Sequence, residues 1–257
     1  MTPRIYLPRN FAEGETAVLD ADLRRYVEIV LRMGPGERLI LFNGKGRECD
    51  AVIGGPNAAS LSVTIMKCRT VEAPSVRITL AQALPKSSKM DLIVQKATEL
   101  GVAEIIPFES ARSIPRLTDG KAAGRVSRWQ KIAVEASRQC GRTTVPEIRP
   151  VATFGDMLCM PPSGARRILF WEAERELSIG SILRNETARD QRDFFIVVGP
   201  EGGFSWSEVE EAKRLCFVTA SLGRLILRTE TAPLAILSII QYETGSLGTL
   251  PVEIAEE

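Results

Sequence analysis

Histidine is absent from all 257 residues of this chain. Without an imidazole the chain has no Ser-His-Asp triad, no histidine general base and no histidine ligand for zinc. We therefore expect no metal site. Any chemistry must depend on carboxylates, arginines, hydroxyls and backbone groups.

Patterned cysteines and long apolar runs are also missing. The five cysteines include no Cys-x-x-Cys pair, which predicts reduced thiols in a cytoplasmic protein and neither a disulfide framework nor a zinc site. No apolar run approaches the roughly 18 residues that cross a bilayer. The first ten residues, MTPRIYLPRN, lack the apolar core of a secretory signal. We expect a cytoplasmic protein without membrane contact.

The net charge is only +1, but it is distributed unevenly. Residues 85–149 carry 12 Lys and Arg against 7 Asp and Glu, whereas residues 150–257 carry 10 against 16. A basic stretch beside an acidic one is typical of a surface that binds a polyanion. A chance imbalance on solvated helix faces explains the same numbers equally well.

The first 70 residues have the pattern of a small β-rich unit. A helix is expected over 20–32, capped by Asp20 or Asp22, and strands over 37–43, 46–53 and 61–68. Asn43-Gly44 predicts a hairpin because both residues tolerate positive φ. We predict a small barrel, with residues 72–75 as the hinge to the next unit.

From residue 76 the pattern alternates between strand and helix, which predicts a parallel sheet with helices on its faces. The expected strands are 76–84, 103–108, 166–172, 194–199 and 218–223. The expected helices are 87–101, 124–140, 206–215 and 233–244. Gly101 is placed to end the first of these helices.

Residues 194–206, FFIVVGPEGGFSW, predict a strand, a glycine-rich loop and the start of a helix with a Ser205–Glu208 capping box. The loop lacks the Lys-Ser/Thr of a P-loop and the spacing of G-x-G-x-x-G. Glu201 would also repel a phosphate. A plain alternative is a tight turn that needs positive φ at Gly202 or Gly203.

A second irregular connection follows at 222–236, LGRLILRTETAPLAI. Pro233 can begin the next helix, with Thr231 or Ala232 near its cap. That helix is apolar on nearly every side until Gln241, so it must be buried against the sheet or another subunit. A connection of this length, rich in Thr and Arg, is costly to order unless it wraps around something.

Together, GPEGGFSWSEVEEAK and SLGRLILRTETAPLAIL resemble the C-terminal signature of the ribosomal RNA small subunit methyltransferase E family. That family belongs to the SPOUT class of trefoil-knotted methyltransferases. LPKSSKMDLIVQKATELGVAEIIPFESARS, RWQKIAVEASRQCGRTTVPEI and LFWEAE resemble other segments of it, and VLRMGPGERLILFNGKG resembles its PUA-like barrel. The resemblance implies an RNA-binding PUA-like β-barrel over 1–72 and an α/β SPOUT knot domain over 73–257.

The resemblance also implies an activity, a cofactor and a homodimer formed through the knot. The family methylates N3 of a uridine in 16S ribosomal RNA with S-adenosylmethionine. This cofactor carries a sulfonium cation and no phosphate, so a carboxylate at position 201 is acceptable. The cofactor-binding residues carried over are Gly199, Gly202, Gly203, Leu222, Gly223, Leu227, Arg228, Thr231 and Ala232.

Methyl transfer to N3 requires loss of the N3 proton and stabilisation of the uracil anion. Without histidine, a carboxylate can take the proton and an arginine can stabilise the anion. The candidates are Glu201, Glu230, Arg228 and Arg142. Both glutamates can instead have a structural role that holds the loops in place. Such a role needs no general base, because in-line placement of the methyl group supplies much of the rate by itself.

The basic middle of the chain provides the RNA-binding candidates. They are Lys86, Lys89, Lys96, Arg112, Arg128, Arg138 and Arg142. Two other functions stay open: a non-catalytic RNA-binding or ribosome assembly factor that kept the fold, and a nucleotide-dependent enzyme of doubly wound topology. Binding of S-adenosylmethionine, and not of ATP or NAD, separates these readings.

Overall fold

The computed structural model describes every residue except 1, 56–59, 73, 114–118, 185–190 and 249–257. The chain forms two compact units, residues 1–73 with 134–145, and residues 74–133 with 146–257. The sequence placed one boundary between 72 and 73. The structure adds a second stretch, 134–145, to the first unit.

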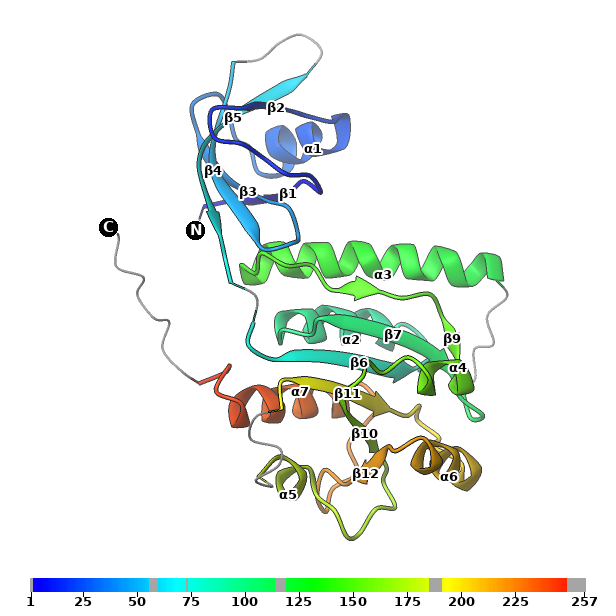
Figure 1. The fold of residues 1–257 in the computed structure, drawn as a ribbon. Helices are drawn as coiled ribbons and strands as arrows, with labels where there is room; N and C mark the ends of the chain where they lie inside the picture. Colours follow the sequence, from blue (N-terminus) through cyan, green and yellow to red (C-terminus); the bar gives the residue numbers. More distant parts are fainter. Residues whose placement is uncertain (1, 56–59, 73, 114–118, 185–190, 249–257) are drawn as a thin grey trace. The chain divides into compact units, whose positions relative to one another are not determined.

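The first unit contains a five-stranded sheet in the order β1-β3-β4-β5-β2 (Figure 1). Its strands are β1 (Arg4–Tyr6), β2 (Thr16–Leu19), β3 (Arg38–Phe42), β4 (Arg47–Ile53) and β5 (Leu61–Thr70). Only β1 and β3 pair in parallel. The pattern predicted β3, β4 and β5. It missed β1 and β2, because three or four residues are too few to show a period of two.

The helix and the hairpin of this unit follow from local hydrogen bonds. Asp20 caps α1 (Ala21–Arg25) by accepting from the Leu23 amide at 2.8 Å, and the chain continues as the π-helix η1 (Tyr26–Val30). Between β3 and β4, Gly44 has a φ of 76°. The Asn43 side chain accepts from the Lys45 amide at 2.8 Å, so the turn is held by the residue types that predicted it.

Two cysteines are bonded to each other, contrary to the expectation of five reduced thiols. Cys49 on β4 lies directly opposite Cys68 on β5, and the two form a disulfide. The expectation was wrong because strand register, which the sequence does not show, places these side chains against each other. Cys140, Cys159 and Cys216 are free thiols.

The second unit is built on a seven-stranded parallel sheet in the order β12-β10-β11-β6-β7-β8, with β9 also paired to β7 (Figure 1). Its strands are β6 (Arg77–Ala83), β7 (Glu104–Glu109), β8 (Glu147–Ile148), β9 (Ala152–Thr153), β10 (Arg166–Phe170), β11 (Asp193–Val198) and β12 (Val218–Ala220). The five strands that the sequence predicted from residue 76 onward are all present. Only the two-residue strands β8 and β9 were not anticipated.

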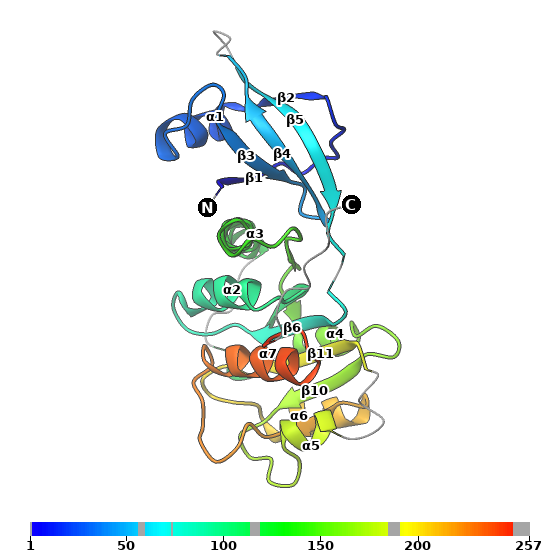
Figure 2. The ribbon, with the colours of Figure 1, turned by 90° about the vertical axis from the view of Figure 1, so that its left-hand side faces the viewer.

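Helices cover both faces of this sheet. They are α2 (Lys89–Glu99), α3 (Asp119–Cys140), α4 (Phe154–Leu158), α5 (Ile179–Arg184), α6 (Trp206–Arg214) and α7 (Ala232–Glu243), and α3 continues into the first unit. In Figure 2, α2 and α7 lie on one side of β6 and β11, and α4 lies on the other. Phe108, Phe154, Phe195 and Phe204 share a core between the sheet and helices α4 and α6.

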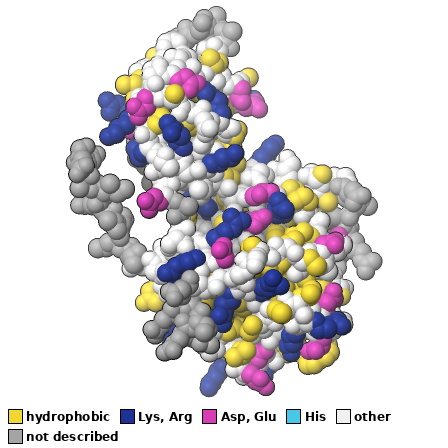
Figure 3. Space-filling view, in the orientation of Figure 1, with side chains coloured by type: hydrophobic (Ala, Val, Ile, Leu, Met, Phe, Trp, Pro, Cys, Tyr) yellow, Lys and Arg dark blue, Asp and Glu magenta, His cyan; other side chains and the backbone are white. Residues whose placement is uncertain are grey.

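On the side drawn in Figure 3, Lys and Arg side chains are interspersed with Asp and Glu over each unit, so the described residues on this side form no uniformly basic surface. Within the described residues, no helix is both long enough and apolar enough to span a membrane.

Candidate active site

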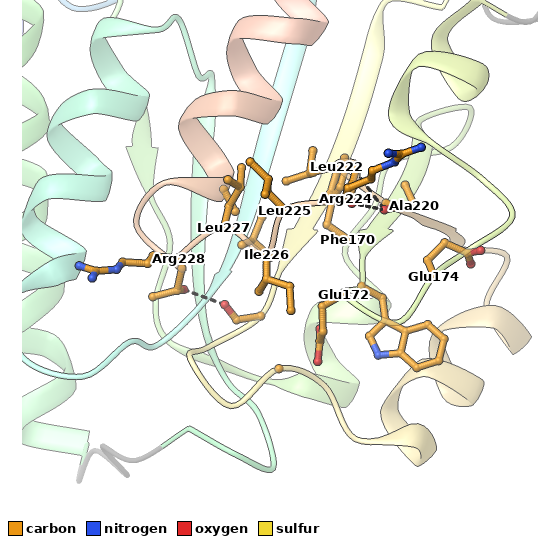
Figure 4. Close-up of a pocket in the computed structure, with 18 of the residues that line it drawn as sticks. Phe170, Glu172, Glu174, Ala220, Leu222, Arg224, Leu225, Ile226, Leu227 and Arg228 are labelled. Atoms are coloured by element: carbon orange, nitrogen blue, oxygen red, sulfur yellow. Dashed lines mark hydrogen bonds between the residues drawn. The ribbon is translucent and has the colours of Figure 1, made fainter.

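A cavity of about 1030 Å³ opens in the second unit, at the carboxyl ends of β10, β11 and β12 (Figure 4). Three connections line it, each following one of these strands: residues 171–178, 199–203 and 221–229. In a parallel sheet these ends meet at one edge, which is where open α/β sheets bind ligands. The volume is sufficient for a ligand of several hundred daltons.

The glycine loop at 199–203 has the conformation that its sequence predicts. Gly203 has a φ of 65°, and its amide donates to the Pro200 carbonyl at 3.0 Å. A Cβ at Gly203 would collide with the Glu172 carboxyl group, 2.8 Å from its Cδ. Ser205 and Glu208 then form the predicted capping box of α6. The loop therefore needs glycine for backbone conformation and for close contact with Glu172.

The glycine loop is joined at its base to the 221–229 connection. The Thr229 hydroxyl donates to the Gly199 carbonyl at 2.8 Å. Gln82, at the end of β6 and fully buried, donates from Nε2 to the Thr229 hydroxyl oxygen at 3.2 Å. These bonds hold two walls of the cavity at a fixed separation.

Glu201 binds groups of the chain itself and not a phosphate. Its carboxylate lies 3.0 Å from the Lys89 Nζ and accepts from the Lys86 amide at 3.2 Å. Burial alone would raise the pKa of Glu201, but the hydrogen bonds from Lys89 and the Lys86 amide hold the pKa below its ordinary value. Lys89 also lies 3.0 Å from Glu230, and the two carboxylates raise the lysine pKa. We call this cluster of Lys89, Glu201 and Glu230 the Lys89 bridge.

Eight of the nine predicted cofactor residues line the cavity. The ninth, Thr231, is instead the N-cap of α7. Of the catalytic candidates, Arg228 and Glu201 line the cavity, and Glu230 belongs to the Lys89 bridge. Arg142 lies in the first unit, where it donates to the Thr144 hydroxyl oxygen at 3.0 Å and burial lowers its pKa.

Most of the RNA-binding candidates have internal partners. Lys96 pairs with Glu99, Arg128 with Asp91, and Arg112 donates to the Gly202 carbonyl. Arg138, whose side chain is only 9% exposed, lies over the Tyr26 ring in the first unit. The Lys86 side chain is exposed and takes part in no hydrogen bond or ion pair within the described residues.

Sequence reasoning missed several residues that line the cavity or hold its walls. Trp171, Glu172, Glu174 and Thr229 line it, and Gln82 supports it through Thr229. Glu174 accepts from the Thr219 hydroxyl at 2.5 Å, which lowers its pKa and makes it part of the wall. The Glu172 carboxylate has no hydrogen-bond donor among the described residues. Residues 171–174, WEAE, directly follow the buried parallel strand β10, and a position at the carboxyl end of such a strand is a signal for a binding site that could have identified them.

The two units match domains of one class of protein. Residues 71–241 match the RNA methyltransferase domain, and residues 29–66 match the RNA methyltransferase PUA domain. The parallel sheet with its cavity and the preceding five-stranded unit are therefore those of an RNA methyltransferase. The predicted SPOUT-type fold with a PUA-like unit is confirmed, while the threading of the knot stays a prediction.

Proteins that are similar to this chain over nearly its whole length identify one family within the class of RNA methyltransferases. Ribosomal RNA small subunit methyltransferase E of Bacillus subtilis is 34% identical over 91% of this chain and 93% of its own. The protein of that name from Rickettsia conorii is 34% identical over 98% of both chains. The crystal structure of methyltransferase E from Neisseria gonorrhoeae bound to S-adenosyl methionine has a TM-score of 0.84, with 34% identity over 94% of this chain and 98% of that one.

A putative methyltransferase from Legionella pneumophila, in complex with the bound cofactor SAM, has a TM-score of 0.80. It is 32% identical over 94% of this chain and 98% of its own. The chain belongs to the ribosomal RNA small subunit methyltransferase E family.

Proposed function

We propose that this protein transfers the methyl group of S-adenosylmethionine to N3 of a uridine in small-subunit ribosomal RNA, in the cytoplasm. The supporting observation is the cavity at the carboxyl ends of β10, β11 and β12. It lies in a fold that matches two solved structures described with this cofactor bound.

The chemistry of the cavity fits the cofactor. Leu222 and Leu227 supply apolar surface, and the glycine loop supplies backbone groups. Glu172 offers an unpaired carboxylate to a ligand that carries a sulfonium, an ammonium group and ribose hydroxyls. We assign cofactor binding to the nine residues carried over from the family, with Thr231 acting through the start of α7.

Among the catalytic candidates, Arg228 has the most support. It lines the cavity, and its guanidinium has no hydrogen-bond partner in the described residues. Figure 4 shows its side chain pointing away from Glu172 and Glu174. When N3 loses its proton, negative charge spreads over O2 and O4 of the uracil. The Arg228 guanidinium makes no hydrogen bond within the described residues, and its positive charge, which also acts on Glu230, can stabilise the uracil anion as it develops.

We also propose a homodimer that forms through α7 and the 221–229 connection. Leu225, Ile226 and Tyr242 are 79%, 81% and 69% exposed, which is unusual for large apolar and aromatic side chains. Leu234, Ala235 and Ile239 on α7 are only half-buried. A second copy of the chain would cover these side chains.

Transfer of radiolabelled methyl groups tests the activity. Purified protein is incubated with labelled S-adenosylmethionine and either protein-free small-subunit RNA or assembled small subunits. A methyl group on N3 blocks Watson–Crick pairing, so reverse transcription should stop at one uridine. Arg228→Ala should reduce methyl transfer much more strongly than it weakens cofactor binding. Binding of cofactor and RNA by the parent without any transfer would indicate a non-catalytic assembly factor instead.

A further inference from the structure

Lys89 joins three segments of the second unit that are far apart in the sequence. It is the first residue of α2, and its ammonium group lies 3.0 Å from Glu201 and 3.0 Å from Glu230. Glu201 belongs to the glycine loop, and Glu230 follows the third connection that lines the cavity. Lys89 itself lines the cavity.

The turn before α2 is held by the same contacts. Ser87 has a φ of 60°, which is uncommon for a residue with a side chain. The amide of the preceding residue, Lys86, donates to the Glu201 carboxylate. Glu201 therefore secures the position from which Lys89 reaches the two loops. The arrangement depends on the negative charge of Glu201 and the positive charge of Lys89.

The charges around Lys89 argue against a role in binding phosphate. Its ammonium group is already balanced by two carboxylates, and Arg228 adds a second positive charge that acts on Glu230, so the Lys89 charge is not free to attract an RNA backbone. The Glu230 pKa is also below its ordinary value: burial would raise it, but its own backbone amide, Lys89 and the charge of Arg228 outweigh burial. Two carboxylates stabilised in the ionised form are weak bases for the N3 proton.

We propose that Lys89 is a positioning residue for methyl transfer, whose ammonium group fixes the two cofactor loops relative to each other through Glu201 and Glu230. This inference rests on the proposed function. It assigns both glutamates to loop positioning and removes Lys89 from the RNA-binding residues. Without Lys89, two like charges remain close together in partly buried positions, with side chains 25% and 16% exposed. The loops would separate.

The first experiment compares Lys89→Met with Lys89→Arg and Lys213→Met. Lys213 is the matched control because it is also a lysine paired with a carboxylate, Glu210 of α6, and it belongs neither to the cavity lining nor to the RNA-binding candidates. Lys89→Met should weaken S-adenosylmethionine binding about tenfold, the order expected when a charged partner is left unpaired. It should lower kcat by about 100-fold, since misplacement of reacting groups by 1 Å has that effect. RNA affinity and its salt dependence should not change.

Rescue distinguishes positioning from a general loss of structure. Lys89→Arg keeps a cation between the carboxylates and should recover most of the cofactor affinity, while Lys213→Met should behave like the parent. Glu201→Gln and Lys89→Met break the same contact, so the double variant should bind cofactor no more weakly than the weaker single variant. In Lys89→Met, protonation of one carboxylate relieves the repulsion. Its activity relative to the parent should therefore rise as the pH is lowered from 8 to about 5.5.

Two results would overturn the inference. If Lys89→Met binds the cofactor like the parent but loses RNA affinity and one unit of salt slope, Lys89 contacts a phosphate. If the effects of Lys89→Met and Glu201→Gln add, the two residues do not act together. A parent protein that neither binds S-adenosylmethionine nor transfers methyl groups refutes the proposed function itself, before any variant is compared.

Discussion

Gly203→Ala is the most direct test that the glycine loop forms part of the cofactor site. The parent residue has a φ of 65°, and the left-handed conformation costs a residue with a Cβ roughly 1–2 kcal/mol. The added Cβ would also collide with the Glu172 carboxyl group. That side chain is exposed and can rotate, so backbone strain is the larger and less avoidable cost.

The strain becomes a loss of affinity because the unliganded loop can relax. To bind the cofactor, the variant must return to the parent conformation, which weakens binding by roughly 5- to 30-fold. Calorimetric titration with S-adenosylmethionine measures this directly. Gly164→Ala is the control, since Gly164 has a φ of 81° and open space around it. It carries the same strain outside the cavity and should leave the affinity unchanged.

A parent-like affinity in Gly203→Ala, with thermal stability also unchanged, would show that the loop does not hold the cofactor in this conformation. The double variant Gly203→Ala with Glu172→Ala separates the two causes. If it binds better than Gly203→Ala alone, the collision with Glu172 contributes. If it does not, backbone strain accounts for the whole effect.

Three further outcomes are expected. Cofactor affinity should change little between about pH 5 and 9. The lowered carboxyl pKa values preserve the Lys89 bridge until the pH falls below the ordinary carboxyl value of about 4, and the raised lysine pKa preserves it up to about 10.4. A midpoint between pH 6 and 8 in calorimetric titrations of cofactor affinity would contradict this. Tyr242→Arg should convert the dimer to a monomer in sedimentation at micromolar concentration, and an unchanged sedimentation coefficient would remove α7 from the interface. Thiol titration in denaturant should find three reactive cysteines before reduction and five after it, whereas five before reduction would exclude the Cys49–Cys68 bond.

The second unit could be read from sequence because its signals are local and repeated. Long apolar runs with turn residues between them predicted β6, β7, β10 and β11, and the Ser205–Glu208 capping box marked the start of α6 to the residue. The two irregular connections were recognised as site loops. Both contribute directly to the cavity.

Contacts between residues distant in sequence could not be read in this way. The disulfide depends on strand register, and the Lys89 bridge depends on three segments meeting in space. Charge alone placed Lys89 and Arg138 on an RNA surface. A charged residue gives no indication in sequence of whether its partner is solvent, RNA or another part of the chain.

The first unit is made from two stretches of chain, 1–73 and 134–145, and this limits how the protein can be dissected. Arg138 lies over Tyr26 and donates to the Arg4 carbonyl, and Arg4 donates to the Arg142 carbonyl. A truncation that begins at residue 74 would leave the end of α3 without these partners. A fragment that stops at residue 73 would lack the same contacts from the other side. No single cut in the gene yields either unit intact, so a swap of the first unit between relatives must exchange both stretches together.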